Sequence, residues 1–206
     1  MTPLKILKDA VLVFEKLGCT YCLIGGHAAS LYRTQPRLTR DVDFALMAEP
    51  ASKSRHLAET VITEMGLSPM LGFIPAGPKE PKRKAICMVT SSPSLGESKG
   101  LIDILLPDLP WLAQAVKRAQ SNKIDLSFKF VPVITPEDLI LAKCYALRNA
   151  PDRFQDLDDL KEIFIAVKDL DVDYVRHEMH KLGLFVPEPV RQFAPAALHA
   201  FGARDE

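Results

Sequence analysis

Apolar side chains along the chain follow helical and strand spacings in the first two thirds, and helical spacing alone afterwards. Residues 4–17 show a helical stripe that Gly18 ends as a C-terminal cap. The same spacing predicts helices over 52–65, closed by Gly66, and over 110–119. Short apolar or alternating runs predict strands near residues 21–24, 39–47, 85–90, 100–106 and 126–131.

The pattern changes near Pro132, after which every periodic segment is helical. Thr135 and Pro136 are typical of a helix start, and this helix should run to about Asn149. We therefore expect an α+β fold in which residues 1–131 form a core with a small mixed sheet. Residues 132–206 should form a C-terminal helical subdomain.

Two acids share one face of the second predicted strand. In Thr39-Arg-Asp-Val-Asp-Phe-Ala-Leu-Met47, apolar and other side chains alternate, so Asp41 and Asp43 project in parallel, about 6.5–7 Å apart at Cα. Carboxylate oxygens at this spacing suit Mg²⁺ or Mn²⁺, which a protein usually holds with one or two carboxylates and the substrate's phosphates. A similar pair, Asp171 and Asp173, opens a predicted helix, where acids stabilise the first turn, and it is not a metal candidate.

Asp103 is a third candidate ligand because it interrupts the apolar strand Leu101-Ile-Asp-Ile-Leu-Leu106. A carboxylate next to Ile102 and Ile104 needs a cation, a metal or hydrogen-bond donors, since an unpartnered buried charge is costly. Metal ligation is favoured, and an ion pair with an arginine or lysine is the alternative.

A glycine pair precedes the acidic strand and can approach a phosphate closely. Gly25-Gly26 follows the first predicted strand, and a helix should begin at His27. The alternative is an ordinary turn between a strand and a helix. His27 either faces the substrate or is satisfied by solvent.

These motifs resemble the minimal nucleotidyltransferases of the DNA polymerase β-like superfamily. The resemblance rests on Gly25-Gly26, a helix, Thr39-Arg40-Asp41-x-Asp43 and the later Asp103. The blocks Pro136–Lys143 and Arg153–Leu160 are similar to motifs of the abortive-infection nucleotidyltransferase toxins, and the resemblance covers about residues 4–167. One departure is Gly26, because the common form of the turn is Gly-Ser, whose hydroxyl contacts phosphate.

The resemblance implies Mg²⁺- or Mn²⁺-dependent transfer of a nucleoside monophosphate from an NTP to an acceptor, either tRNA, a protein or a small molecule. Asp41 and Asp43 would hold metal, and Asp103 would hold a second ion or act as base. Lys143 would offset developing charge, and the nucleotide-binding residues would be Gly25, Gly26, His27, Arg40 and Asp156. A cognate antitoxin or toxin protein is a possible partner. The alternative function is a nucleotide-binding or protein-binding module without turnover.

Helical spacing alone also makes Lys143 unusual. Leu139, Ala142, Ala146 and Leu147 surround it within an apolar stripe, so its ammonium either reaches water or meets an anion. Asp156 and Asp159 share a face of the next predicted helix and are the candidate partners.

Composition limits the remaining possibilities. The chain has 206 residues with 48% hydrophobic content, enough to bury a core. Lys and Arg total 26, as do Asp and Glu, so the formal net charge is zero. The protein therefore has no overall positive potential that would attract nucleic acid or an anionic membrane surface. The basic stretch Lys79–Lys84 fits a solvated loop better than a binding site for triphosphate or an acceptor strand.

The sequence shows neither the apolar core of a secretory signal nor an apolar run long enough to span a membrane. We therefore expect the protein to reside in a reducing cytoplasm. Cys19 and Cys22 match C-x-x-C without a second pair to complete a zinc site, which favours core cysteines over a redox pair.

Overall fold

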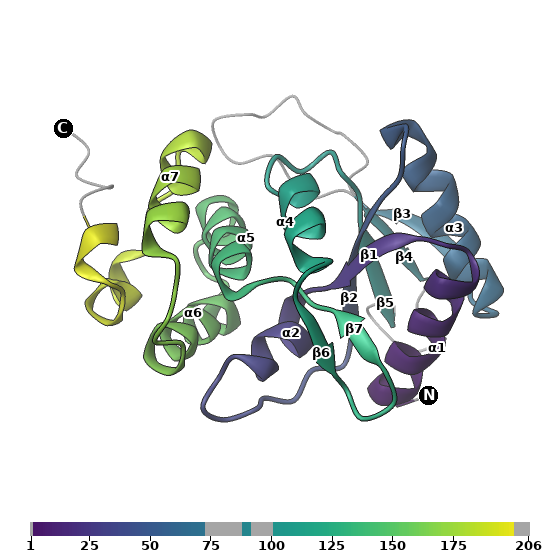
Figure 1. Cartoon of the computed structure of the whole chain (residues 1–206), viewed down its shortest axis with the longest axis horizontal. Helices are drawn as coiled ribbons and strands as arrows, with labels where there is room; N and C mark the ends of the chain where they lie inside the picture. Colours follow the sequence, from purple (N-terminus) through teal and green to yellow (C-terminus); the bar gives the residue numbers. More distant parts are fainter. Residues whose placement is uncertain (1, 73–87, 92–100, 200–206) are drawn as a thin grey trace. The chain divides into compact units, whose positions relative to one another are not determined.

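The computed structural model describes residues 2–72, 88–91 and 101–199, which form two compact units (Figure 1). Within the described residues, the first unit contains 2–28, 37–72, 88–91 and 101–134. The second contains 29–36 and 135–199. The predicted fold class is confirmed, since the chain has a mixed five-stranded sheet and a helical C-terminal part.

The sheet of the first unit has the strand order β1-β2-β5-β4-β3. Strands β2 and β5 are parallel, and the other neighbours pair antiparallel. The parallel register places Asp43 of β2 beside Asp103 of β5. The strands are β1 (Thr20–Leu23), β2 (Val42–Met47), β3 (Pro69–Gly72), β4 (Met88–Ser91) and β5 (Ile102–Leu105).

Helices α1 (Pro3–Lys16) and α3 (Ser54–Glu64) contact each other, and both contact β2. The ring of Phe14 in α1 meets Phe44 of β2 with centroids 4.8 Å apart and stacks on Tyr21 of β1 at 4.4 Å. Alternation along β2 then turns Asp43 to the opposite face from Phe44. The aromatic cluster therefore fixes which face of the sheet carries the acids.

The first unit ends with helix α4 (Leu112–Ala119) and the hairpin of β6 (Lys123–Asp125) and β7 (Phe130–Pro132). The predicted strand over 126–131 is wrong for residues 126–129, which form the turn of the hairpin. Ser127 has a φ of 67°, and its backbone N–H donates to Asp125 Oδ1 at 2.9 Å. Neither β3 nor β6 was expected from the sequence.

The second unit is helical, with α5 (Pro136–Asn149) in contact with both α6 (Phe154–Ala166) and α7 (Val172–Leu182). The predicted cap is confirmed, because the Thr135 hydroxyl accepts from the backbone N–H of Asp138. Asp171 caps α7 in the same way. Its assignment to a helix start is therefore confirmed. Two short 3-10 helices follow, η2 (Glu188–Phe193) and η3 (Ala196–Leu198).

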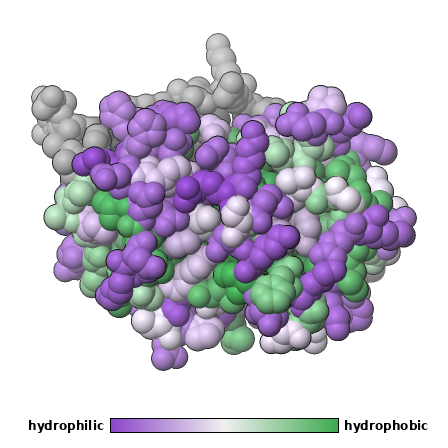
Figure 2. All heavy atoms as spheres, viewed as in Figure 1, coloured by the Kyte–Doolittle hydropathy of each residue, from purple (hydrophilic) through white to green (hydrophobic). Residues whose placement is uncertain are grey.

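Hydrophilic residues cover most of the face drawn in Figure 2, and the apolar areas on it are small and interrupted. Among the described residues, no helix combines the length and the apolar character that a membrane span requires.

Candidate functional site

Three carboxylates meet at one end of the central strand pair. Asp41 precedes β2, Asp43 lies within it, and Asp103 is the cross-strand neighbour of Asp43 on β5. Each offers an oxygen, and these oxygens all lie within 4.8 Å of one another. All three residues are half-buried. The structure therefore brings together the three acids that the sequence predicted as metal ligands.

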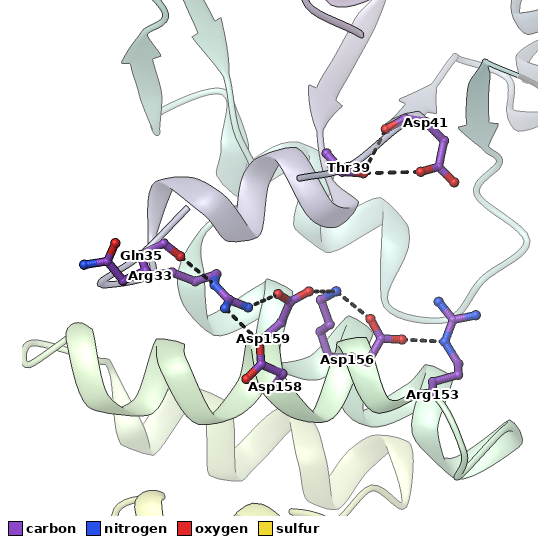
Figure 3. Close-up of polar contacts among 9 residues, drawn as sticks. Arg33, Gln35, Thr39, Asp41, Arg153, Asp156, Asp158 and Asp159 are labelled. Carbon is purple, nitrogen blue, oxygen red and sulfur yellow. Dashed lines mark hydrogen bonds and ion pairs between the residues drawn. The ribbon is translucent and has the colours of Figure 1, made fainter. Parts of the chain in front are cut away.

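Asp41 lies just outside the strand, because β2 begins at Val42 and not at residue 39 as the alternation predicted. The Thr39 hydroxyl lies 3.2 Å from both the backbone oxygen and Oδ1 of Asp41 (Figure 3). This contact holds the residue as the chain enters β2. Three clustered carboxylates repel one another, and a divalent cation with a preference for oxygen ligands offsets that repulsion. The donor set, which is all oxygen, fits Mg²⁺ or Mn²⁺ better than zinc.

Asp103 has a partner that the sequence did not reveal. Thr90 of β4 pairs with Asp103 in the antiparallel register, and its hydroxyl donates to Asp103 Oδ1 at 2.5 Å. Thr90 is 7% exposed, so this bond is shielded from water. The hydroxyl fixes the orientation of the carboxylate in the acid cluster.

The predicted glycine turn packs directly on the acids. Gly25 begins helix α2 (Gly25–Leu31) with a φ of +64°, a conformation that side chains disfavour. A Cβ built at Gly25 would lie 1.9 Å from Oδ2 of Asp43. The backbone N–H of Ile24 also donates to the Asp43 carbonyl at 2.9 Å. The turn and the acidic strand are therefore a single packed arrangement.

Gly26 is crowded by different groups. A Cβ there would lie 2.8 Å from Nη2 of Arg37 and 3.0 Å from Oγ1 of Thr39. Arg37 is half-buried, whereas Arg40, the predicted nucleotide contact, is exposed.

His27 is partly buried beside the acids. Burial lowers the pKa of its imidazole. Asp41 raises this pKa, and Arg37 lowers it. Its Nε2 is buried and meets no hydrogen-bond partner among the described residues. Its predicted contact with substrate stays a prediction.

In the second unit, Lys143 is buried and meets both candidate partners, so of the two alternatives its ammonium meets an anion. Its ammonium donates to Asp156 and to Asp159, each at 2.6 Å. Arg153 also pairs with Asp156. Lys143 therefore joins α5 to α6 through two buried carboxylates.

The same network contains an arginine that sequence patterns did not single out. Arg33 donates to Asp159 at 2.5 Å and to Asp158 at 2.8 Å (Figure 3). The side chains of Arg33 and Asp159 are 7% and 0% exposed. Arg33 lies in the aperiodic stretch after α2, where no spacing rule indicated a partner.

The basic stretch Lys79–Lys84 lies outside the described residues.

Neither a family model nor a curated protein sequence matches the chain. Solved structures do resemble it. The antibiotic-resistance factor ANT(2'')-Ia in complex with adenylyl-2''-tobramycin has a TM-score of 0.57 and 14% identity over 86% of this chain and 97% of that one. The solution structure of ANT(2'')-Ia gives a TM-score of 0.55 and 13% identity over 86% of this chain and 91% of that one.

An antigenic nucleotidyltransferase-like protein from Paracoccidioides brasiliensis has a TM-score of 0.50 and 14% identity, with 85% of each chain covered. At these identities the likeness concerns the fold. The chain therefore has a nucleotidyltransferase fold that carries an acid cluster of Asp41, Asp43 and Asp103.

Proposed function

We propose that the protein transfers a nucleoside monophosphate from an NTP to an acceptor and releases pyrophosphate, with Mg²⁺ or Mn²⁺ as cofactor. The observation that carries the proposal is the meeting of three carboxylates beside the Gly25 turn, on a nucleotidyltransferase fold. A divalent ion bound there supplies positive charge to the phosphates during in-line displacement.

The chain's own groups have distinct roles in this proposal. Asp41 and Asp43 hold metal, and Asp103, oriented by Thr90, holds a second ion or accepts the proton of the acceptor hydroxyl. The acceptor oxygen forms a bond to the α-phosphorus as the bond to the leaving pyrophosphate breaks. The backbone of the Gly25–Gly26 turn approaches the phosphates, and the absence of side chains there leaves room for the Asp43 carboxylate and the Arg37 guanidinium.

Lys143 and Asp156 keep their proposed place in the nucleotide site on the basis of resemblance. Their mutual ion pair gives them a scaffold role as well, because it connects α5 to α6. His27 and Arg40 are proposed nucleotide contacts on the same basis.

The acceptor is tRNA, a protein or a small molecule. The neighbour that holds adenylyl-2''-tobramycin supports including hydroxyl-bearing small molecules among the acceptors to test. Membership of a toxin–antitoxin pair, with a cognate protein partner, rests on the sequence resemblance.

The test is incubation of the protein with each NTP labelled at the α-phosphate, with cell extract or small-molecule acceptors, and with Mg²⁺ or Mn²⁺. Label should appear on an acceptor and disappear when Asp41 and Asp43 are both changed to Asn. Asp173→Asn is the matched control, because Asp173 also belongs to a D-x-D pair but lies exposed on α7, and it should leave labelling intact. Nucleotide binding without any transfer would instead support the non-catalytic module.

A further inference from the structure

The two glycines of the turn lie against different groups. Gly25 has a positive φ and faces an acid, whereas Gly26 has no unusual φ and faces a base. A Cβ at Gly26 would lie 2.8 Å from Nη2 and 3.1 Å from Cζ of Arg37. The contact to Nη2 is shorter than real Cβ contacts, so a side chain at position 26 would push the end of the flexible Arg37 side chain away from the turn.

This places a guanidinium beside the acid cluster within the first unit. Asp41 raises the pKa of His27 and Arg37 lowers it, which is consistent with all three groups lying close together. Thr39 Oγ1, which contacts Asp41, also lies 3.0 Å from the point that a Cβ at position 26 would occupy. The Arg37 guanidinium thus lies beside Gly26 and near the Thr39 hydroxyl that contacts Asp41.

The proposed substrate needs a cation at this point. An NTP brings several negative charges toward Asp41, Asp43 and Asp103, and α2 is only 7 residues long, so backbone dipoles alone supply little positive potential. Arginine suits the task because its planar guanidinium stays charged and donates two parallel hydrogen bonds to phosphate oxygens.

We propose that Arg37 binds the phosphate groups of the NTP and that Gly26, which has no side chain, leaves the guanidinium in the position to do so. The inference rests on the proposed function and adds a specific phosphate-binding residue to it. It also differs from the contact expected from sequence, which assigned Arg40 to the nucleotide.

Binding tests the assignment. Isothermal titration with inorganic tripolyphosphate and with the four NTPs, each with Mg²⁺, is performed on the wild type and on Arg37→Gln. We expect about 10- to 100-fold weaker binding of both kinds of ligand to Arg37→Gln, the usual effect of losing charge-assisted hydrogen bonds. Arg37→Lys keeps the charge and should recover part of the affinity. Arg55→Gln, which removes a half-exposed arginine on α3, should bind as the wild type does.

A double-mutant cycle separates phosphate binding from packing. Gly26→Ala should weaken tripolyphosphate binding in the wild type because it displaces the guanidinium. The same change in an Arg37→Ala background should have no further effect on affinity. Melting temperatures of all variants are measured in parallel, so that a loss of affinity is assigned only to folded protein.

The outcomes distinguish the two proposals. If the wild type binds Mg²⁺-NTP and Arg37→Gln binds it equally well, the role of Arg37 is wrong while the proposed function stands. The same holds if Arg40→Gln, and not Arg37→Gln, carries the loss. If the wild type binds neither tripolyphosphate nor any NTP, the proposed function fails and the role of Arg37 fails with it.

Discussion

The carboxylate of Asp43 lies where a side chain of Gly25 would have to be, with Oδ2 only 1.9 Å from the position of a Cβ. This relationship links the glycine turn to the acid cluster more directly than any hydrogen bond. A residue with a side chain at position 25 would have to move the acid that we assign to metal binding.

Gly25→Ala should therefore weaken Mn²⁺ binding and also lower the free energy of unfolding. The left-handed φ alone costs about 1–2 kcal/mol for alanine, and displacement of Asp43 adds to this cost. The matched control is Gly18→Ala, because Gly18 has the same φ of +64° but open space around its Cβ position. Urea denaturation should show a loss for both variants, and Mn²⁺ titration should show a loss for Gly25→Ala alone. Equal Mn²⁺ affinity in both would contradict the link between the turn and the metal site.

Thr90→Val removes the hydroxyl that orients Asp103 while keeping the shape of the side chain. The Asp103 carboxylate would lose a shielded donor, so we expect weaker Mn²⁺ binding and slower nucleotidyl transfer. The free energy of unfolding should fall by about 1–3 kcal/mol. Thr90→Ser retains the hydroxyl and should retain most of the activity. If Val and Ser behave alike in both assays, the hydroxyl has no part in positioning Asp103.

Asp103→Asn should separate activity from stability. Removing one of three clustered charges reduces repulsion in the protein without metal, so the melting temperature should stay near the wild-type value or rise. Nucleotidyl transfer should be lost, because the metal or the acceptor proton loses its carboxylate. A large drop in melting temperature with intact NTP binding would identify Asp103 as half of a structural ion pair.

Much of this arrangement was accessible from the sequence because it depends on local rules. Alternation located Asp41 and Asp43, and an apolar strand made Asp103 conspicuous. The apolar stripe singled out Lys143 and named Asp156 and Asp159 as its candidate partners. The cap at Thr135 followed from side-chain chemistry alone. Each of these inferences needs only residues that are close together along the chain.

The features that were missed depend on contacts between distant segments. Thr90 lies in a short apolar strand, and its importance appears only when the register with Asp103 is known. Arg33 and Arg37 belong to a stretch without helical or strand periodicity, so nothing indicated their partners. Strand β3 begins with Pro69 and ends with Gly72, both poor strand residues, and it forms through pairing with β4.

Lys143→Met should destabilise the protein by about 3–5 kcal/mol, because it leaves Asp156 and Asp159 buried with one cation fewer. The double variant Lys143→Met, Asp159→Asn should recover part of this loss, since it also removes a buried negative charge. Denaturant unfolding measures both. A second readout, the NTP affinity of the folded variants, tests the proposed place of Lys143 in the nucleotide site. Unchanged affinity would leave it a purely structural residue.

Cys19 and Cys144 should be unreactive in the folded protein. Burial raises the pKa of Cys19 to about 11 and that of Cys144 to about 12, so at pH 8 only about one thiol in a thousand at Cys19 is a thiolate, and fewer at Cys144. Because the thiolate is the reactive form, alkylation of Cys19 should rise about tenfold with each pH unit until the pH nears 11.

Peptide mass spectrometry after timed iodoacetamide treatment can follow each cysteine separately. Unfolded protein in urea is the control, and there both residues should react at the rate of a free thiol. Of the C-x-x-C pair, Cys22 is buried as a core cysteine should be, whereas Cys19 is only half-buried. Rapid labelling of native Cys19 at pH 8 would contradict its predicted low reactivity and restore the Cys19–Cys22 pair as a redox candidate.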